Sequence, residues 1–136
     1  MAAEGGSDMM SEDHKRAGLS APESFWAASK ERRAMVCGGC GAGKLGNLLV
    51  PDTLWGLNVT ICCDIHDWRY RFGATIEDKN SADREMLNNM LRWIEYKTDW
   101  AILRYLRNSR ALKYYEAVQA FGGPAFWNGK NKEGQI

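Results

Sequence analysis

Several features are scarce in this 136-residue chain, and each absence narrows what the protein can be. Only three prolines and two histidines occur, and no apolar run approaches the roughly 20 residues that a membrane-spanning helix needs. The formal net charge of +1 lacks the basic excess of a nucleic-acid-binding domain, so we expect no nucleic-acid partner. Residues 1–23 lack the apolar stretch of a secretory signal. We therefore expect cytoplasmic synthesis or a mature form without its leader, with export or a place in a virion both open.

The residues that are present fit one helical domain. Apolar residues make up 45% and charged residues 26% of the chain, which is ordinary for a globular protein with a single core. Residues 1–19 contain four acids and few large apolar side chains, so we predict a flexible segment there. Residues 20–124 are predicted to form a mostly α domain, because helical spacing recurs and period-two alternation is missing. Gly122-Gly123-Pro124 should end it, leaving residues 125–136 as an irregular tail.

The expected helices follow from apolar spacing and from end signals. A short helix is predicted over residues 20–34, because Ser20 and Glu23 form a capping-box pattern. Five glycines in residues 37–46 exclude a helix and predict a loop. The further helices predicted by periodicity are 59–72, one beginning near residue 80 or 81, and two more around 100–106 and 112–121. Gly73 is expected to end the first of these.

The predicted helix 59–72 carries the residues that are most suggestive of chemistry. Cys62, Cys63, His66 and Tyr70 fall on one side of it, because spacings of three and four return to the same face. Asp67 lies about 100° further round. An imidazole and a carboxylate so placed can serve one pocket, the first activating water and the second binding a hard cation. Calcium prefers about six to eight oxygens, and the carbonyls of the upstream glycine-rich loop are suited to supply several.

Loop and helix together resemble the phospholipase A2 superfamily, in a short, bacterial-, phage- or parvovirus-like form. The residues that carry the resemblance are Cys40-Gly41-Ala42-Gly43 in the loop and Cys62-Cys63-Asp64-Ile65-His66-Asp67-Trp68-Arg69-Tyr70 in the helix. The resemblance implies a fold with two antiparallel core helices and a calcium loop. It also implies calcium-dependent hydrolysis of the sn-2 ester of glycerophospholipids at a membrane interface, and hence a hydrolase of lipid degradation.

The resemblance assigns a role to each matching residue. His66 would be the general base that takes a proton from water, and Asp83 would orient it, with the hydroxyl of Tyr70 supporting Asp83. Asp67 would bind Ca²⁺. The loop residues whose carbonyls would complete the metal site are Gly39, Gly41 and Gly43. Physically, the metal would polarise the ester and a loop amide would donate to the developing oxyanion.

The chain also departs from the family pattern. Arg69 stands where secreted enzymes have a disulfide cysteine, and only 17 residues separate His66 from Asp83, so the usual β-hairpin between the helices must be missing. The loop has Gly39 where tyrosine is usual and Lys44 where glycine often follows. These departures leave a second hypothesis, a phospholipase-like structural or lipid-binding module incorporated in a larger assembly such as a virus or phage particle.

The four cysteines permit three interpretations. The resemblance implies a disulfide between Cys40 and Cys63, and Cys37 and Cys62 could pair beside it. A Cys37-x-x-Cys40 knuckle joined by a helix residue would instead predict a zinc-stabilised binding domain. Free buried thiols are the third possibility.

Overall fold

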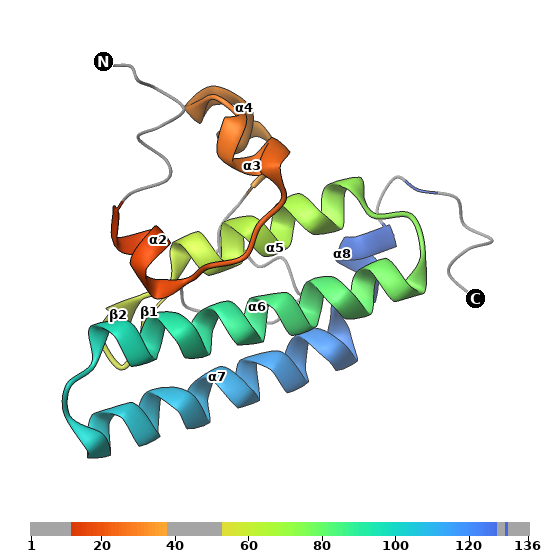
Figure 1. Cartoon of the computed structure of the whole chain (residues 1–136). Helices are drawn as coiled ribbons and strands as arrows, with labels where there is room; N and C mark the ends of the chain where they lie inside the picture. Colours follow the sequence, from red (N-terminus) through yellow and green to blue (C-terminus); the bar gives the residue numbers. More distant parts are fainter. Residues whose placement is uncertain (1–11, 38–52, 128–129, 131–136) are drawn as a thin grey trace.

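The computed structural model describes residues 12–37, 53–127 and 130, and within them the chain is mostly helical, as predicted (Figure 1). The helices are α2 (Glu12–Ala17), α3 (Glu23–Ala27), α4 (Lys30–Val36), α5 (Thr60–Phe72), α6 (Ile76–Lys97), α7 (Ala101–Phe121) and α8 (Gly123–Trp127). A two-stranded antiparallel hairpin, β1 (Thr53–Leu54) and β2 (Leu57–Asn58), precedes α5. None of the helices in these ranges combines the length and apolarity needed to cross a bilayer.

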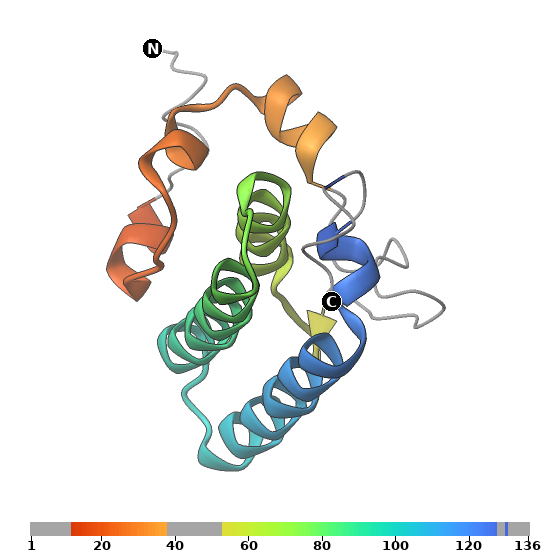
Figure 2. The ribbon, with the colours of Figure 1, turned by 90° about the vertical axis from the view of Figure 1, so that its right-hand side faces the viewer.

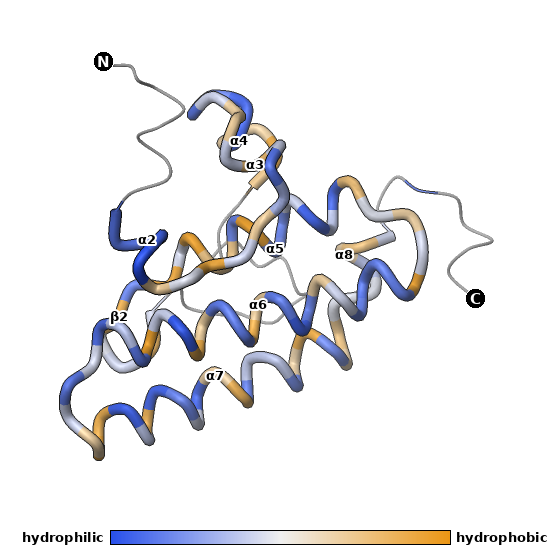
Figure 3. Tube along the Cα trace, viewed as in Figure 1, coloured by the Kyte–Doolittle hydropathy of each residue, from blue (hydrophilic) through white to orange (hydrophobic). Residues whose placement is uncertain are grey.

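The three long helices run up and down in sequence, with α6 between α5 and α7 (Figures 1 and 2). α6 buries a stripe formed by Ala82, Met86, Met90 and Ile94, whose spacing of four keeps them on one face. Figure 3 shows apolar residues alternating with polar residues along the three long helices. Because neighbouring helices bury these stripes against each other, α5 and α6 are held side by side.

The prediction for the start of α6 was wrong by about one turn. The helix begins at Ile76, because Thr75 and Asp78 form a capping box. The side chain of each of these two residues accepts a hydrogen bond from the backbone N–H of the other. Asp78 also accepts a hydrogen bond from the amide of Ala74 at 2.8 Å. The early start adds a turn of helix before Asp83, and it places Lys79 on the same face as Asp83.

Other boundaries also differ from the sequence predictions. The single helix expected over residues 20–34 is two helices, because the hydroxyl of Ser29 accepts the amide of Arg32 and caps a new helix there. The two stretches expected around 100–106 and 112–121 are one continuous helix, α7. The predicted tail begins inside α8, where Phe126 and Trp127 are buried. The hairpin was not predicted; its turn residues Trp55 and Gly56 both have positive φ, typical of a two-residue hairpin turn.

Within the segment predicted to be flexible, residues 12–17 form helix α2, which packs on α6. Tyr96 donates a hydrogen bond to Asp13 at 2.9 Å. Asn89, fully buried, accepts from the amide of Ser20 and donates to its carbonyl, both at 2.8 Å. The segment is held by these polar contacts and by Leu19, which is buried in the core with Ala17 packed beside it. Because few residues of the segment make such contacts, its composition alone predicted flexibility.

Candidate active site

His66 and Asp83 face each other across the contact between α5 and α6. Nε2 of His66 lies 2.7 Å from Oδ1 of Asp83, and both residues are buried, with 5% and 0% of their surfaces exposed. Tyr70, one turn after His66 on α5, donates its hydroxyl to the same Oδ1 at 2.7 Å. The structure therefore brings together three predicted site residues that lie on two helices.

The second oxygen of Asp83 is also fully engaged, by residues that the sequence analysis did not select. Lys79 donates to Oδ2 at 2.8 Å from one turn earlier on α6, and Gln119 donates to it at 2.9 Å from α7. A carboxylate offers about four lone-pair positions, so four donors saturate Asp83. The spacing of Lys79 and Asp83, four residues apart, was a readable signal. Gln119 is 36 residues from Asp83, and nothing local in the sequence pointed to it.

These contacts determine which protonation states are stable. Burial by itself raises the pKa of Asp83, but the hydrogen bonds donated by His66, Lys79 and Tyr70 hold it below its ordinary value. Burial, reinforced by the charge of Asp83, raises the pKa of Tyr70, so its hydroxyl keeps the proton that it donates. Asp83 is therefore a buried carboxylate whose charge is balanced by the ammonium of Lys79, itself 4% exposed.

The same geometry fixes the tautomer of His66. A carboxylate only accepts hydrogen bonds, so Nε2 must carry the imidazole proton in the neutral ring. The lone pair is then on Nδ1, which accepts no hydrogen bond from any described residue. The ring of Tyr70 lies 4.1 Å from the imidazole between centroids and restricts its rotation. His66 is thus presented as a base with a defined accepting nitrogen.

Close packing around Tyr70 supports its position. A Cβ at Gly122 would lie 2.6 Å from the Tyr70 hydroxyl oxygen, so the chain between α7 and α8 can pass there only as glycine. Phe126 of α8 packs edge-on against the Tyr70 ring at 5.1 Å. A Cβ at Gly73 would in turn come within 2.8 Å of Phe126. The start of α8 therefore closes over Tyr70.

Asp67 lies near the point where the glycine-rich segment begins. Cys37, the last described residue before that segment, donates its thiol to the carbonyl of Asp64 at 3.1 Å. Burial and the charges of Asp64 and Asp67 raise the pKa of Cys37 to about 12. Cys37 therefore lies against α5, at Asp64, about one helical turn before Asp67. The predicted ligands Gly39, Gly41 and Gly43 lie outside the described residues, as does Cys40.

The cysteines settle part of the earlier prediction. Cys63 is disulfide-bonded, whereas Cys37 and Cys62 are free, so the pairing of Cys37 with Cys62 was wrong. Cys62 is fully buried and burial raises its pKa, so it behaves as a small apolar side chain. Zinc binds cysteine as the thiolate. The disulfide-bonded Cys63 is therefore not a free zinc ligand, which weighs against its part in the zinc hypothesis.

No protein-family model, curated protein or solved structure matches this chain. Within the described ranges, no group of three or more His, Cys, Asp and Glu side chains is arranged to hold a metal ion. Of the residues predicted to bind calcium, the described part of the chain thus supplies one carboxylate, that of Asp67.

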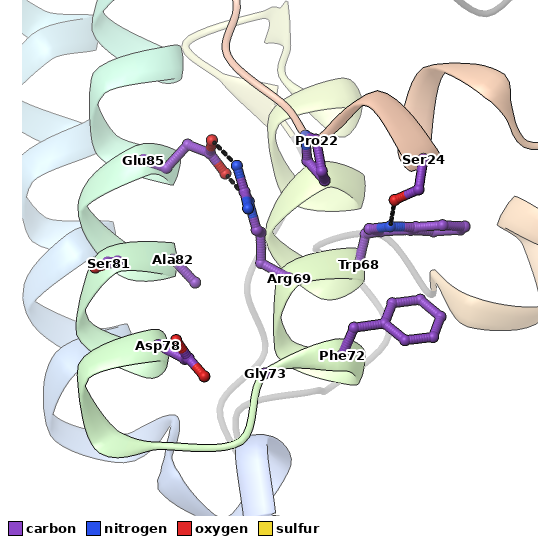
Figure 4. Close-up of a pocket in the computed structure, with 10 residues that line it drawn as sticks. All are labelled: Pro22, Ser24, Trp68, Arg69, Phe72, Gly73, Asp78, Ser81, Ala82 and Glu85. Atoms are coloured by element: carbon purple, nitrogen blue, oxygen red, sulfur yellow. Dashed lines mark hydrogen bonds and ion pairs between the residues drawn. The ribbon is translucent and has the colours of Figure 1, made fainter.

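A cleft of about 320 Å³ opens on the other side of α5, between α3, α5 and α6 (Figure 4). Trp68 and Phe72 form one wall of the cleft. They follow His66 and Tyr70 by two residues each, and a step of two residues places a side chain on the opposite face of a helix. Arg69 crosses the cleft to Glu85 in a bidentate ion pair with distances of 2.9 and 3.0 Å. Arg69 therefore links α5 to α6 through its hydrogen bonds to Glu85, and not through His66 or Asp83.

Proposed function

We propose that the protein is a calcium-dependent phospholipase A2-like esterase that cleaves the sn-2 ester of glycerophospholipids. The observation that carries the proposal is the hydrogen bond from Nε2 of His66 to the buried carboxylate of Asp83, which Tyr70 shares. The phospholipase A2-like fold is part of the same proposal, supported by the antiparallel pair α5 and α6 that presents these residues.

The first step follows from the tautomer of His66. Nδ1 accepts a proton from a water molecule as that water attacks the ester carbonyl, and the imidazolium that forms is stabilised by Asp83 through Nε2. Asp83 stays ionised, because its remaining lone pairs are already occupied by donors. His66 then returns the proton to the leaving alkoxide, which completes hydrolysis and restores the neutral ring.

Calcium fits the donors that the chain offers. Asp67 would hold it through its carboxylate, with the carbonyls of Gly39, Gly41 and Gly43 as further ligands. The support from the structure is that Cys37 anchors the start of the glycine-rich segment to Asp64, one turn from Asp67. When bound, the ion supplies Lewis-acid polarisation of the ester carbonyl.

The test is release of fatty acid from phospholipid vesicles labelled in the sn-2 chain. We expect release with calcium, none with chelator, and loss of release in His66→Gln and Asp67→Asn. His14→Gln is the matched control, because His14 is the only other histidine and lies among Trp26 and Trp93, away from Asp83. Release that persists with chelator, or that survives His66→Gln, would overturn the proposal.

Measurements of binding separate the proposal from the structural-module hypothesis. Calorimetric titration with calcium and sedimentation with intact vesicles report binding without hydrolysis. A wild-type protein that sediments with vesicles but binds no calcium at millimolar concentration and releases no fatty acid would be a lipid-binding module, and the esterase assignment would be withdrawn.

A further inference from the structure

We infer that Lys79 and Gln119 are positioning residues for His66, acting through Asp83; their part in hydrolysis rests on the function proposed above. Neither residue touches the imidazole. Lys79 and Gln119 hold Oδ2 of Asp83 at 2.8 and 2.9 Å, which leaves Oδ1 to His66 and Tyr70. The resemblance led us to expect the hydroxyl of Tyr70 at this carboxylate, and the chain adds an ammonium and an amide to it.

The argument begins with the freedom of the carboxylate. An aspartate held only through Oδ1 can turn about its terminal torsion, which has a broad energy profile. Here donors from two different helices, Lys79 on α6 and Gln119 on α7, fix Oδ2. With both oxygens held, the plane of the carboxylate is set, and so is the direction from which Nε2 of His66 must approach Oδ1.

The second step concerns the cost of burying Lys79. Its side chain is 5% exposed, and removing an ammonium from water is unfavourable unless a partner compensates. An apolar side chain would fill the same volume without that penalty. The compensating groups are the Asp83 carboxylate and, at 3.4 Å, the carbonyl of Val118 on α7. Lys79 therefore joins Asp83 to α7, so α7 takes part in orienting His66 although it lies beyond α6.

The experiment follows the Nε2 proton of His66 by ¹H–¹⁵N NMR together with steady-state hydrolysis. In the wild-type protein we expect this buried proton to be observable and slow to exchange with solvent. Lys79→Met should raise its exchange rate at least about tenfold and lower kcat about 10- to 100-fold, by analogy with the loss of outer hydrogen-bond partners at metal-binding histidines. KM and calcium affinity should stay unchanged, because Asp67 is untouched.

Gln119→Met removes one donor and leaves the ion pair intact, so it should raise the exchange rate and lower kcat by smaller factors than Lys79→Met. It also tests the inference if Lys79→Met does not fold. Lys97→Met is the matched control, a lysine on the same helix whose side chain is 40% exposed, and it should change neither quantity.

The outcomes separate this inference from the proposed function. A wild-type Nε2 proton that exchanges freely would overturn the inference. So would folded variants at Lys79 and Gln119 with unchanged proton exchange, or a loss of kcat without any change at that proton. If the wild-type protein releases no fatty acid while exchange still rises in the variants, the proposed function fails and the positioning of His66 by these residues stands.

Discussion

Asp83→Asn is the substitution with which the candidate site is most directly tested, because it preserves the shape of the side chain and changes what it can accept. The four groups around Asp83 all donate, two to each oxygen. Asparagine keeps one accepting oxygen and replaces the other with an NH₂ group that donates. Two of the four donors must then face a donor, and the buried ammonium of Lys79 loses its countercharge.

The magnitude follows from burial. Asp83 is 0% and Lys79 4% exposed, and removing one partner of a buried ion pair costs about 3–5 kcal/mol. A domain of this kind has a free energy of unfolding of about 5–15 kcal/mol, so the variant should be marginal. With a urea m-value of roughly 2 kcal/mol/M, the midpoint should fall by about 2 M.

The same substitution should reverse the tautomer of His66. The asparagine oxygen is attracted to Lys79, which turns its NH₂ group toward Nε2. Nε2 must then accept, and the imidazole proton moves to Nδ1, the nitrogen that the proposed mechanism needs unprotonated. We therefore expect esterase activity to fall by about 10⁴, the loss that the wrong tautomer causes in a triad of comparable geometry.

Urea unfolding followed by circular dichroism measures the stability, with Asp99→Asn as the control because Asp99 is exposed between α6 and α7. The double variant Lys79→Met with Asp83→Asn removes the uncompensated ammonium and should be more stable than Asp83→Asn alone. A cost below about 1 kcal/mol for Asp83→Asn, or a double variant less stable than either single one, would refute this account of the site.

Three further predictions use other observations. Because the pKa of Asp83 is lowered on folding, its contribution to stability is present above about pH 4 and is lost as the pH falls through the folded-state pKa. As the pH is lowered, the free energy of unfolding should therefore fall more steeply for the wild type than for Asp83→Asn. Parallel curves of free energy against pH would contradict this. Gly122→Ala should cost about 1–3 kcal/mol in thermal unfolding and displace the Tyr70 hydroxyl, whereas Gly123→Ala, whose Cβ would meet nothing within 4 Å, should be nearly neutral; equal effects would exclude the close contact. Arg69→Ala removes a bidentate ion pair from a partly exposed site, so it should lower the free energy of unfolding by up to about 1 kcal/mol, and by less at high salt. A loss of stability that does not depend on salt would rule out the ion pair as its cause.

Local features of the sequence were sufficient for the parts of the fold that depend on neighbours along the chain. The helix that carries His66 and its end at Gly73 follow from spacing and from a helix-stop residue, and both agree with α5. The common face of His66 and Tyr70 follows from a separation of four residues. The start of α6 was missed, although its signal, Thr75 three residues before Asp78, is also local; an aspartate in place of the usual glutamate made the capping box harder to recognise.

The sequence by itself proposed His66 as a base and Asp67 as a cation ligand from chemical type and helical spacing, and the family resemblance added Asp83 as the orienting acid. Only the tertiary structure decided the state of Asp83. Asp83 is buried because α6 packs between α5 and α7. The same packing brings Lys79 and Gln119 to its second oxygen, although Gln119 is 36 residues away in the sequence. Spacing along one helix carries no information about what a second and third helix will present to the same oxygen. The ionised state of Asp83 and the orientation of His66 were therefore fixed by helix packing.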